Sequence, residues 1–390
     1  MQFKDIIGQR PLINRLTEVI DSGKVSHAQL FCGRMGYGTL ALALAYVQYL
    51  NCQNRKHYAE PGTATGLRAD SCGECPSCKK IGKMVFSDLH FIFPNAATSK
   101  VESKPSSADF YDEFSTFVTE NRGYCTTEGW FRYLGVESKQ GIINVRDANE
   151  IIRLLGLKTY ESQYKSAIVW MPEKMNIEAS NKLLKTLEEP SSNTLIIMVA
   201  ENTDRLLSTI VSRTQSVIVH KIDAESLAQA LVKSHPELPV ETINQAAAAA
   251  QGDYLAACEM LGQSEQKAYF AKLFMNWMRQ LFKLNMQPLS KTVDEISSLG
   301  REQQKQFLRY VLEVVRACFL KNIAGTDAPY TLKFDDQKFT TAFPTMITVN
   351  NIEKLENIIN ESLYSIERNS YSKITFMNLS FVISKLLKNR

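Results

Sequence analysis

The segment Phe31–Leu40, with the sequence FCGRMGYGTL, constrains this chain more than any other stretch. Gly33 and Gly38 have the spacing of a phosphate-binding loop, in which lysine and then serine or threonine follow the second glycine. Thr39 stands at the lysine position and Leu40 at the hydroxyl position. Thr39 carries no charge for a phosphate, and Leu40 has no oxygen for Mg²⁺. The segment therefore predicts a nucleotide-binding architecture that has lost its catalysis.

The residues on either side of this segment fit a strand, a glycine turn and a helix. Residues 28–32 form a short apolar run that is typical of a buried strand, and residues 39–50 are rich in Ala, Leu and Tyr, as in a helix. A vestigial phosphate-binding loop is one interpretation, and any parallel strand–helix unit with a glycine turn is the other. The candidate vestigial site consists of Gly33, Gly36, Gly38 and Thr39.

Apolar runs alternate with helical stretches through the first half of the chain. Residues 166–171 and 194–200 are mainly apolar runs of the kind found in buried strands, and residues 89–94 and 217–219 form shorter runs. A helix is expected over residues 176–187. This alternation predicts an α/β fold whose parallel sheet is covered by helices on both faces.

The predicted strand 166–171 ends in the sequence Trp170-Met171-Pro172-Glu173. In an active P-loop ATPase, acidic residues at this position hold Mg²⁺ and polarise the attacking water. Only Glu173 is acidic here. We interpret a lone glutamate as a solvated residue or as a partner of the next helix start, not as a catalyst.

Four of the eight cysteines have the spacing of a metal site: Cys52, Cys72, Cys75 and Cys78. The last three form two CxxC knuckles that share their middle cysteine. Four thiolates saturate a tetrahedral Zn²⁺ and leave no position for a substrate water, so we predict a structural zinc ion. Reduced cysteines with accidental spacing are the alternative. His57 is an alternative to Cys52 as the fourth ligand, and residues 57–70 are expected to form a loop inside the module.

The length of 390 residues exceeds what one hydrophobic core usually supports. The apolar strands stop after His220, and short helices begin at Asp223. We therefore expect a first domain over residues 1–220, a three-helix domain over 221–263 and a helical domain over 264–390. Helices of the last domain are expected over 265–285, 301–323, 351–367 and 373–388.

No apolar run approaches the length of a transmembrane helix, and the start Met1–Asp5 lacks the apolar core of a signal peptide, so we expect a cytoplasmic protein without membrane contact. The net charge of +4 neither demands nor excludes nucleic acid. Lys and Arg are spread thinly, so the isolated chain should have little affinity for DNA.

Residues 95–139 are harder to interpret. Their first part is rich in Ser, Thr, Lys and Glu, which indicates an exposed loop. Phe110, Phe114 and Phe117 have helical spacing and predict one helix. The aromatic run 130–134 contacts either the body of the protein or a partner, and packing against the body is the preferred interpretation.

Several of these segments resemble the bacterial DNA polymerase III clamp-loader family of AAA+ proteins. Residues 182–190, KLLKTLEEP, closely resemble the helix that follows the Walker B strand in this family. Residues 6–9, residues 27–31 and the cysteine insert match the same family, and Ser212-Arg213-Thr214 stands where the family carries Ser-Arg-Cys. The resemblance covers about residues 1–260.

The family contains two relevant types of subunit. The motor subunit, gamma or tau, hydrolyses ATP, whereas the delta-prime subunit has a defective nucleotide site and lends an arginine to its neighbour. Thr39, Leu40 and the absence of aspartate at Trp170 and Met171 fit delta-prime. The family's Gly-Ser-x-Arg lid motif reads Gly-Asp-Tyr-Leu at residues 252–255, without its arginine.

Arg213 alone would be interpreted as a surface arginine. The resemblance implies instead that it is an arginine finger, which reaches the γ-phosphate of ATP held by the adjacent motor subunit. Such a finger neutralises charge that develops during phosphoryl transfer and contributes ~10³–10⁵ in rate.

The resemblance implies an α/β AAA+ P-loop-type domain with a zinc module, followed by an all-α lid and an all-α collar. It implies a non-hydrolysing, delta-prime-like accessory subunit of the DNA polymerase III holoenzyme in DNA replication, with structural Zn²⁺ and no functional ATP site. The implied partners are the gamma/tau and delta subunits, the sliding clamp and, through the complex, primer–template DNA.

Two other functions fit parts of the sequence. The first is an active gamma/tau-type ATPase with an atypical P-loop, because backbone amides at a helix N-terminus bind phosphate without lysine. The second is a zinc-dependent nucleic-acid-binding protein with an incidental strand–helix fold. ATP turnover by the purified chain would favour the first, and tight DNA binding by the monomer would favour the second.

Overall fold

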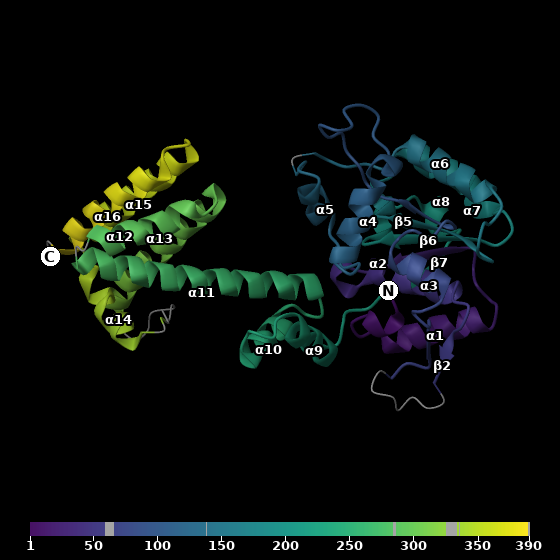
Figure 1. Ribbon diagram of the computed structural model, residues 1–390, viewed down its shortest axis with the longest axis horizontal. Helices are drawn as coiled ribbons and strands as arrows, with labels where there is room; N and C mark the ends of the chain where they lie inside the picture. The colour runs from purple at the N-terminus through teal and green to yellow at the C-terminus, as the bar shows by residue number, and fades with distance from the viewer. Residues whose placement is uncertain (59–65, 138, 284–285, 325–333, 335, 389–390) are drawn as a thin grey trace. The chain divides into compact units, whose positions relative to one another are not determined.

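The structure is a computed structural model that describes residues 1–58, 66–137, 139–283, 286–324, 334 and 336–388. The chain divides into two compact units, Met1–Leu261 and Gly262–Arg390. The first unit contains the sheet, and the second is built from helices in the part of the chain that is described (Figure 1).

The first unit has a five-stranded sheet with the strand order β4-β5-β6-β1-β7. All neighbouring strands are parallel. The strands are β1 (Ala28–Cys32), β4 (Leu89–Ile92), β5 (Lys165–Trp170), β6 (Thr194–Ala200) and β7 (Gln215–Ile218). β1 comes first in the chain but lies between β6 and β7. Open parallel sheets with such crossovers bind ligands beyond the carboxyl ends of their central strands.

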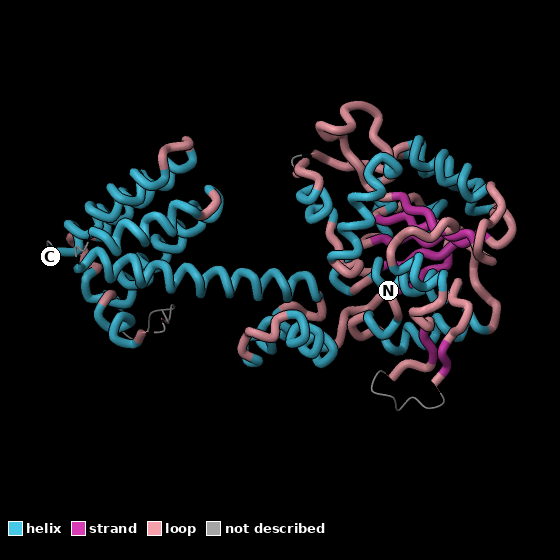
Figure 2. Tube along the Cα trace, in the orientation of Figure 1, coloured by secondary structure: helices cyan, strands magenta, loops and turns pink. Residues whose placement is uncertain are grey.

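Alternate residues of the central strands face opposite sides of the sheet. Trp170 and Val199 belong to the core that packs under α1 (Arg10–Asp21), α2 (Thr39–Leu50) and α4 (Tyr111–Glu120). Val169 and Met198 belong to the core that packs under α6 (Val145–Gly156) and α7 (Ile177–Glu188). This division has the two-residue period of a strand and confirms the predicted parallel sheet with helices on both faces, as Figure 2 shows.

The helices of the first unit include most of those that the sequence predicts. β1 and α2 have the predicted bounds, because both are continuous apolar stretches separated by glycines. The helices are α1 (Arg10–Asp21), α2 (Thr39–Leu50), α3 (Pro76–Gly82), α4 (Tyr111–Glu120), α5 (Thr127–Tyr133), α6 (Val145–Gly156), α7 (Ile177–Glu188), α8 (Ser208–Val211), α9 (Ala224–Ser234) and α10 (Val240–Ala249).

The aromatic run 130–134 packs against the body through Trp130 and Phe131, as preferred above, and the described part of the segment 95–139 holds two α-helices, α4 and α5, where one was expected. Trp130 is fully buried, and its indole N–H donates to the carbonyl of Pro94 at 2.9 Å. Phe114 stacks on Phe93 with ring centroids 3.8 Å apart. Burial of these aromatic rings fixes the segment to β4.

Helix α11 (Tyr254–Lys283) contradicts the predicted helix break at residues 263–264. The third short helix and the first helix of the C-terminal domain are one element. The segment contains no proline, and Gly262 in its interior costs only about 1 kcal/mol relative to alanine, so the helix continues through it.

The second unit also contains two helices that were not anticipated, α12 and α14. Its helices after α11 are α12 (Met286–Ser298), α13 (Arg301–Ala324), α14 (Gln337–Ala342), α15 (Ile352–Glu367) and α16 (Ser372–Lys388). Trp277 of α11 is fully buried in this unit and donates to the Ser380 hydroxyl at 2.8 Å. Within the described ranges, no helix is long and apolar enough to cross a membrane.

The predicted loop 57–70 begins and ends in a short antiparallel ribbon, because β2 (Lys56–His57) pairs with β3 (Ala69–Asp70). The central part of the predicted loop, residues 59–65, lies outside the described residues. Asp70 fixes the ribbon to the start of the chain, since its carboxylate accepts the N–H groups of Phe3 at 2.9 Å and Lys4 at 3.0 Å.

Candidate functional site

The glycine turn lies at the carboxyl end of β1 and leads directly into α2. Gly38 has a left-handed φ of 84°, which a glycine adopts without steric cost. A Cβ atom on Gly33 would lie 2.5 Å from the carbonyl oxygen of Val219, so the turn passes close to the backbone after β7. The four predicted residues of the vestigial loop are therefore brought together in one turn.

Thr39 closes this turn from inside. Its side chain is fully buried, and its hydroxyl is within 3.2 Å of the carbonyl oxygens of both Gly33 and Arg34. The hydroxyl thus donates to the loop backbone, where a lysine would extend its ammonium toward phosphates. This geometry gives the turn an internal bond and no cation from position 39.

A carboxylate lies against the middle of the turn. A Cβ atom on Gly36 would stand 1.7 Å from Asp253 Oδ1, so the Asp253 side chain occupies the space beside the Gly36 backbone. The same Oδ1 accepts the N–H of Ala256 at 3.0 Å and so caps the start of α11. Negative charge at this position disfavours an anionic ligand on the turn.

Tyr124, from the segment 95–139, covers the end of the turn. A Cβ atom on Gly38 would lie 2.7 Å from the Tyr124 hydroxyl, which accepts the N–H of Ile7 at 3.0 Å. The Tyr124 ring meets that of Tyr254 edge-on, with centroids 5.0 Å apart. Burial raises the pKa of the Tyr124 phenol, so it stays neutral. One side chain therefore joins the N-terminal segment, the turn and the start of α11.

Glu173, which follows β5, is half-buried and not freely exposed; free exposure was one of the two interpretations above. Its Oε1 accepts the N–H of Glu201 at 2.9 Å, which ties the ends of β5 and β6 together. Its Oε2 is buried without a hydrogen-bond partner among the described residues. Burial raises the pKa of this carboxyl. Glu173 is thus a half-buried group that bridges the ends of β5 and β6, and it lies in the first turn of the short 3-10 helix Pro172–Lys174, beside a helix start as one interpretation expected.

Arg213 is paired within its own chain. Its Nε and Nη2 atoms both lie 2.5 Å from Oε1 of Glu188, and Nη1 donates to the Thr209 carbonyl at 3.0 Å. Glu188 is the last residue of α7, and Arg213 follows α8. The fold therefore brings together the two segments, 182–190 and 212–214, that the sequence analysis singled out separately.

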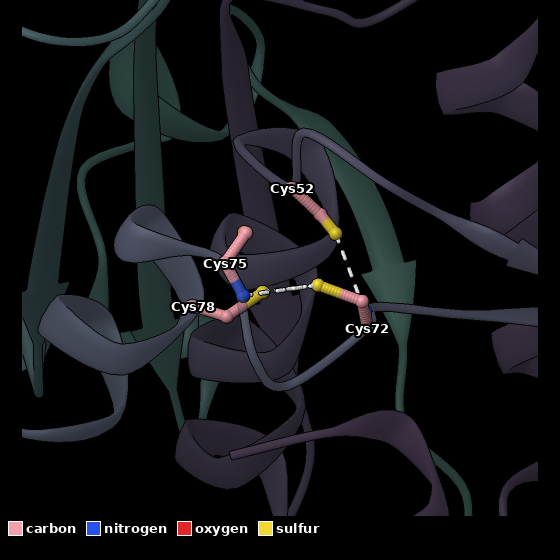
Figure 3. A group of neighbouring side chains, drawn as sticks. All are labelled: Cys52, Cys72, Cys75 and Cys78. Carbon is pink, nitrogen blue, oxygen red and sulfur yellow. Dashed lines mark hydrogen bonds between the residues drawn. The ribbon is translucent and has the colours of Figure 1, made fainter.

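The four predicted cysteine ligands form one cluster, in which all sulfur atoms lie within 4.8 Å of one another (Figure 3). The Sγ atoms of Cys72 and Cys78 are 3.9 Å apart. His57 does not join the cluster and lies 3.8 Å from Asp21 instead. Cys52, and not His57, is therefore the fourth member.

This cluster fits a zinc ion. Zinc–sulfur bonds of about 2.3 Å in a tetrahedron place sulfur atoms about 3.8 Å apart, close to the Cys72–Cys78 separation. Burial raises the pKa of the Cys52 and Cys78 thiols. Burial would also raise the pKa of Cys72, but hydrogen bonds from the N–H groups of Glu74 and Cys75 and from the neighbouring cysteine side chains together lower the pKa of Cys72 to about 6. Such N–H bonds stabilise the thiolate that binds a metal.

Sequence reasoning did not anticipate the roles of Tyr124, Asp253 and Glu188. For Asp253 a signal was available, because an acidic residue stands in the segment that lacks the lid arginine. Tyr124 carries no motif, and its contact with the turn depends on how the segment 95–139 folds back. Glu188 lies inside the recognisable segment 182–190, but nothing in the sequence pairs it with Arg213.

Comparisons with known proteins agree on one family. A family model described as "DNA polymerase III, delta subunit" matches residues 8–223. DNA polymerase III subunit gamma of Buchnera aphidicola is 25% identical over 211 residues, which are 54% of this chain and 43% of that protein. DNA polymerase III subunit delta' of Bacillus subtilis is 26% identical over 234 residues, 60% of this chain and 54% of that protein.

The subunit delta' of Haemophilus influenzae is 26% identical over 282 residues, which are 72% of this chain and 69% of that protein. The chain thus spans about half the length of the first two relatives. The gamma and delta' relatives match at similar identity, so identity alone does not separate the two types of subunit.

Proposed function

The chain belongs to the DNA polymerase III delta subunit family of clamp-loader proteins, and from this premise we propose that it is a non-hydrolysing, delta-prime-like subunit of the clamp loader. In this role it binds no ATP productively itself. It supplies Arg213 to ATP held by a neighbouring motor subunit while a sliding clamp is loaded onto DNA.

The observation that carries this proposal is the filled glycine turn. Phosphate binding at such a turn needs free backbone N–H groups and a nearby cation. Here the Tyr124 hydroxyl lies against Gly38, and the Asp253 carboxylate lies against Gly36. Thr39 turns its hydroxyl toward the loop carbonyls. These contacts support a turn that no longer holds a nucleotide.

The assembly proposed for this protein follows from the family. Residues 1–220 form an AAA+ domain, and the lid and collar are divided inside α11 instead of between two helices. The collar joins gamma/tau and delta subunits, and contact with primer–template DNA goes through the complex. Contacts to phosphates carry no sequence information, so this DNA binding should weaken as salt increases.

The zinc ion that we propose for Cys52, Cys72, Cys75 and Cys78 is structural. With four thiolate ligands it has no open coordination position, so it supplies folding energy to the module and no Lewis-acid chemistry. The ribbon β2–β3 and Asp70 connect this module to the first residues of the chain.

A gamma/tau-type ATPase is the second candidate, because gamma and tau relatives match at nearly the same identity as delta' relatives. Equilibrium binding of ATP to the purified chain and its turnover separate the two candidates. We expect neither binding at millimolar ATP nor turnover. Turnover that is abolished by Glu173→Gln would establish the motor-type function instead.

A further inference from the structure

The guanidinium of Arg213 is already occupied in this chain. Its Nε and Nη2 atoms contact Glu188, and Nη1 contacts the Thr209 carbonyl and, at 3.4 Å, the Ser212 hydroxyl. The Nε–Nη2 edge is the one that guanidinium groups use to bind carboxylate or phosphate with two parallel bonds. Glu188 therefore holds the edge that a phosphate would need.

Glu188 is badly placed for stabilising its own helix. It is the last residue of α7, where the helix dipole disfavours a carboxylate, and Glu189 adds a second negative charge beside it. Its contact with Arg213 offsets this unfavourable position. Arg213 is thus the cation that stabilises the Glu188 carboxylate at this helix end.

The ion pair between Arg213 and Glu188 is also weak enough for Arg213 to change its partner. The side chains of Arg213 and Glu188 are 35% and 47% exposed, and ion pairs with such exposure contribute little because water competes for both charges. A γ-phosphate carries more charge than one carboxylate, so at the same separation it attracts the guanidinium more strongly.

We propose that Glu188 is a positioning residue that holds and neutralises Arg213 in the unengaged subunit and releases it to the γ-phosphate of ATP on the neighbouring subunit. This inference rests on the proposed role of Arg213 as a finger that acts in trans. The Glu188 carboxylate therefore competes with the γ-phosphate of ATP for the Arg213 guanidinium. Each time the phosphate binds Arg213, the carboxylate must be displaced.

The test uses the reconstituted clamp loader with motor and delta subunits, and measures KM and kcat for ATP in the presence of clamp and primer–template DNA. Glu188→Gln keeps the side-chain shape and removes the competing charge. We expect the KM to fall about threefold to fivefold, the range that an exposed ion pair supports, with kcat unchanged within about twofold. A merely structural role would change the melting temperature and would not lower the KM.

Glu189→Gln is the matched control, because it removes the same charge one residue further on, from a side chain that makes no ion pair within the described chain. Glu188→Asp, which keeps the charge, should retain the wild-type KM. In an Arg213→Ala background, Glu188→Gln should change nothing, because the two substitutions act through one contact.

The outcomes separate the inference from the function on which it rests. If Arg213→Ala reduces turnover but Glu188→Gln leaves the KM unchanged or raises it, Glu188 has no such role and the trans-acting arginine stands. An equal effect of Glu189→Gln also overturns the inference, since the effect is then one of general charge. If Arg213→Ala has no effect, the proposed finger itself is wrong and the role of Glu188 is overturned with it.

Discussion

The carboxylate of Asp253 lies against the backbone of Gly36, so close that a Cβ atom on Gly36 would stand 1.7 Å from Oδ1. Gly36→Ala should therefore force Asp253 away and break its bond to the Ala256 N–H, at a cost of about 1–2 kcal/mol. Thermal or urea unfolding of the variant measures this loss.

Two controls identify the cause of that loss. Gly156→Ala adds the same methyl group where no atom lies within 4 Å, so it should leave stability unchanged or raise it slightly. Asp253→Ala removes the obstacle, so Gly36→Ala should cost less in that background. Equal costs with and without Asp253 would mean that the two residues do not meet.

The zinc proposal predicts about one tightly bound zinc ion per chain, measured by elemental analysis of the purified protein. Cys78→Ser should reduce the zinc content and lower the melting temperature, because metal binding and folding of the module are coupled. Cys258→Ser, which changes a half-buried cysteine outside the cluster, should keep the full zinc content.

DNA binding separates this structural role from a nucleic-acid-binding zinc module. The isolated chain should bind DNA weakly, and Cys75→Ala should disorder the module without changing that weak binding. Tight DNA binding that disappears in Cys75→Ala would favour the zinc-dependent nucleic-acid-binding function instead.

Asp88 gives the first unit a defined pH dependence. Its carboxylate accepts N–H groups of Tyr160 and Glu161 at 2.8 Å and of Ser162 at 3.0 Å. Burial alone would raise its pKa, but these bonds outweigh burial and hold the pKa below its ordinary value. Its contribution to stability is therefore complete above the unfolded-state pKa of about 3.9 and is lost as pH falls through the folded-state value.

Asp88→Asn should accordingly reduce the free energy of unfolding at pH 7, and the difference from wild type should shrink as pH falls from about 4, where the unfolded-state carboxylate is protonated, through the lower folded-state pKa. Urea unfolding as a function of pH measures this. Glu120→Gln, which changes an exposed carboxylate without an ion pair in the described ranges, should leave the free energy of unfolding at pH 7 close to the wild-type value. A constant difference at all pH values would contradict the linkage.

Local patterns predicted the parts of this fold that local sequence determines. The apolar run of β1, the glycines of the turn and the continuous apolar stretch of α2 lie next to one another, so their order and bounds follow from a short window. The cysteine cluster could be predicted for the same reason, since three of its members lie within seven residues.

Contacts between distant segments were not predictable in this way. Tyr124 and Asp253 reach the turn because the segment 95–139 and the start of α11 fold back onto it, and no local period encodes that return. The continuity of α11 was missed because separate helices were expected on either side of residues 263–264, where Gly262 is the one weak helix former. In an otherwise helical stretch without proline, one glycine is too small a penalty to end a helix.

The role of Arg213 gives the most direct test of the proposed function. Arg213→Ala should leave assembly with motor and delta subunits intact, because Arg213 and its partner are both partly exposed. It should reduce the ATP turnover that clamp and DNA stimulate. The reduction should reach up to ~10³-fold at the one subunit boundary that this arginine serves, and it should be smaller in the total turnover of the complex.

Arg213→Lys should not restore turnover, because an ammonium lacks the planar edge that binds two phosphate oxygens. Arg205→Ala removes an exposed arginine that precedes α8 and forms no ion pair in the described chain, so turnover should remain at the wild-type level. If Arg213→Ala turns ATP over as fast as wild type in a correctly assembled complex, the arginine does not act across a subunit boundary.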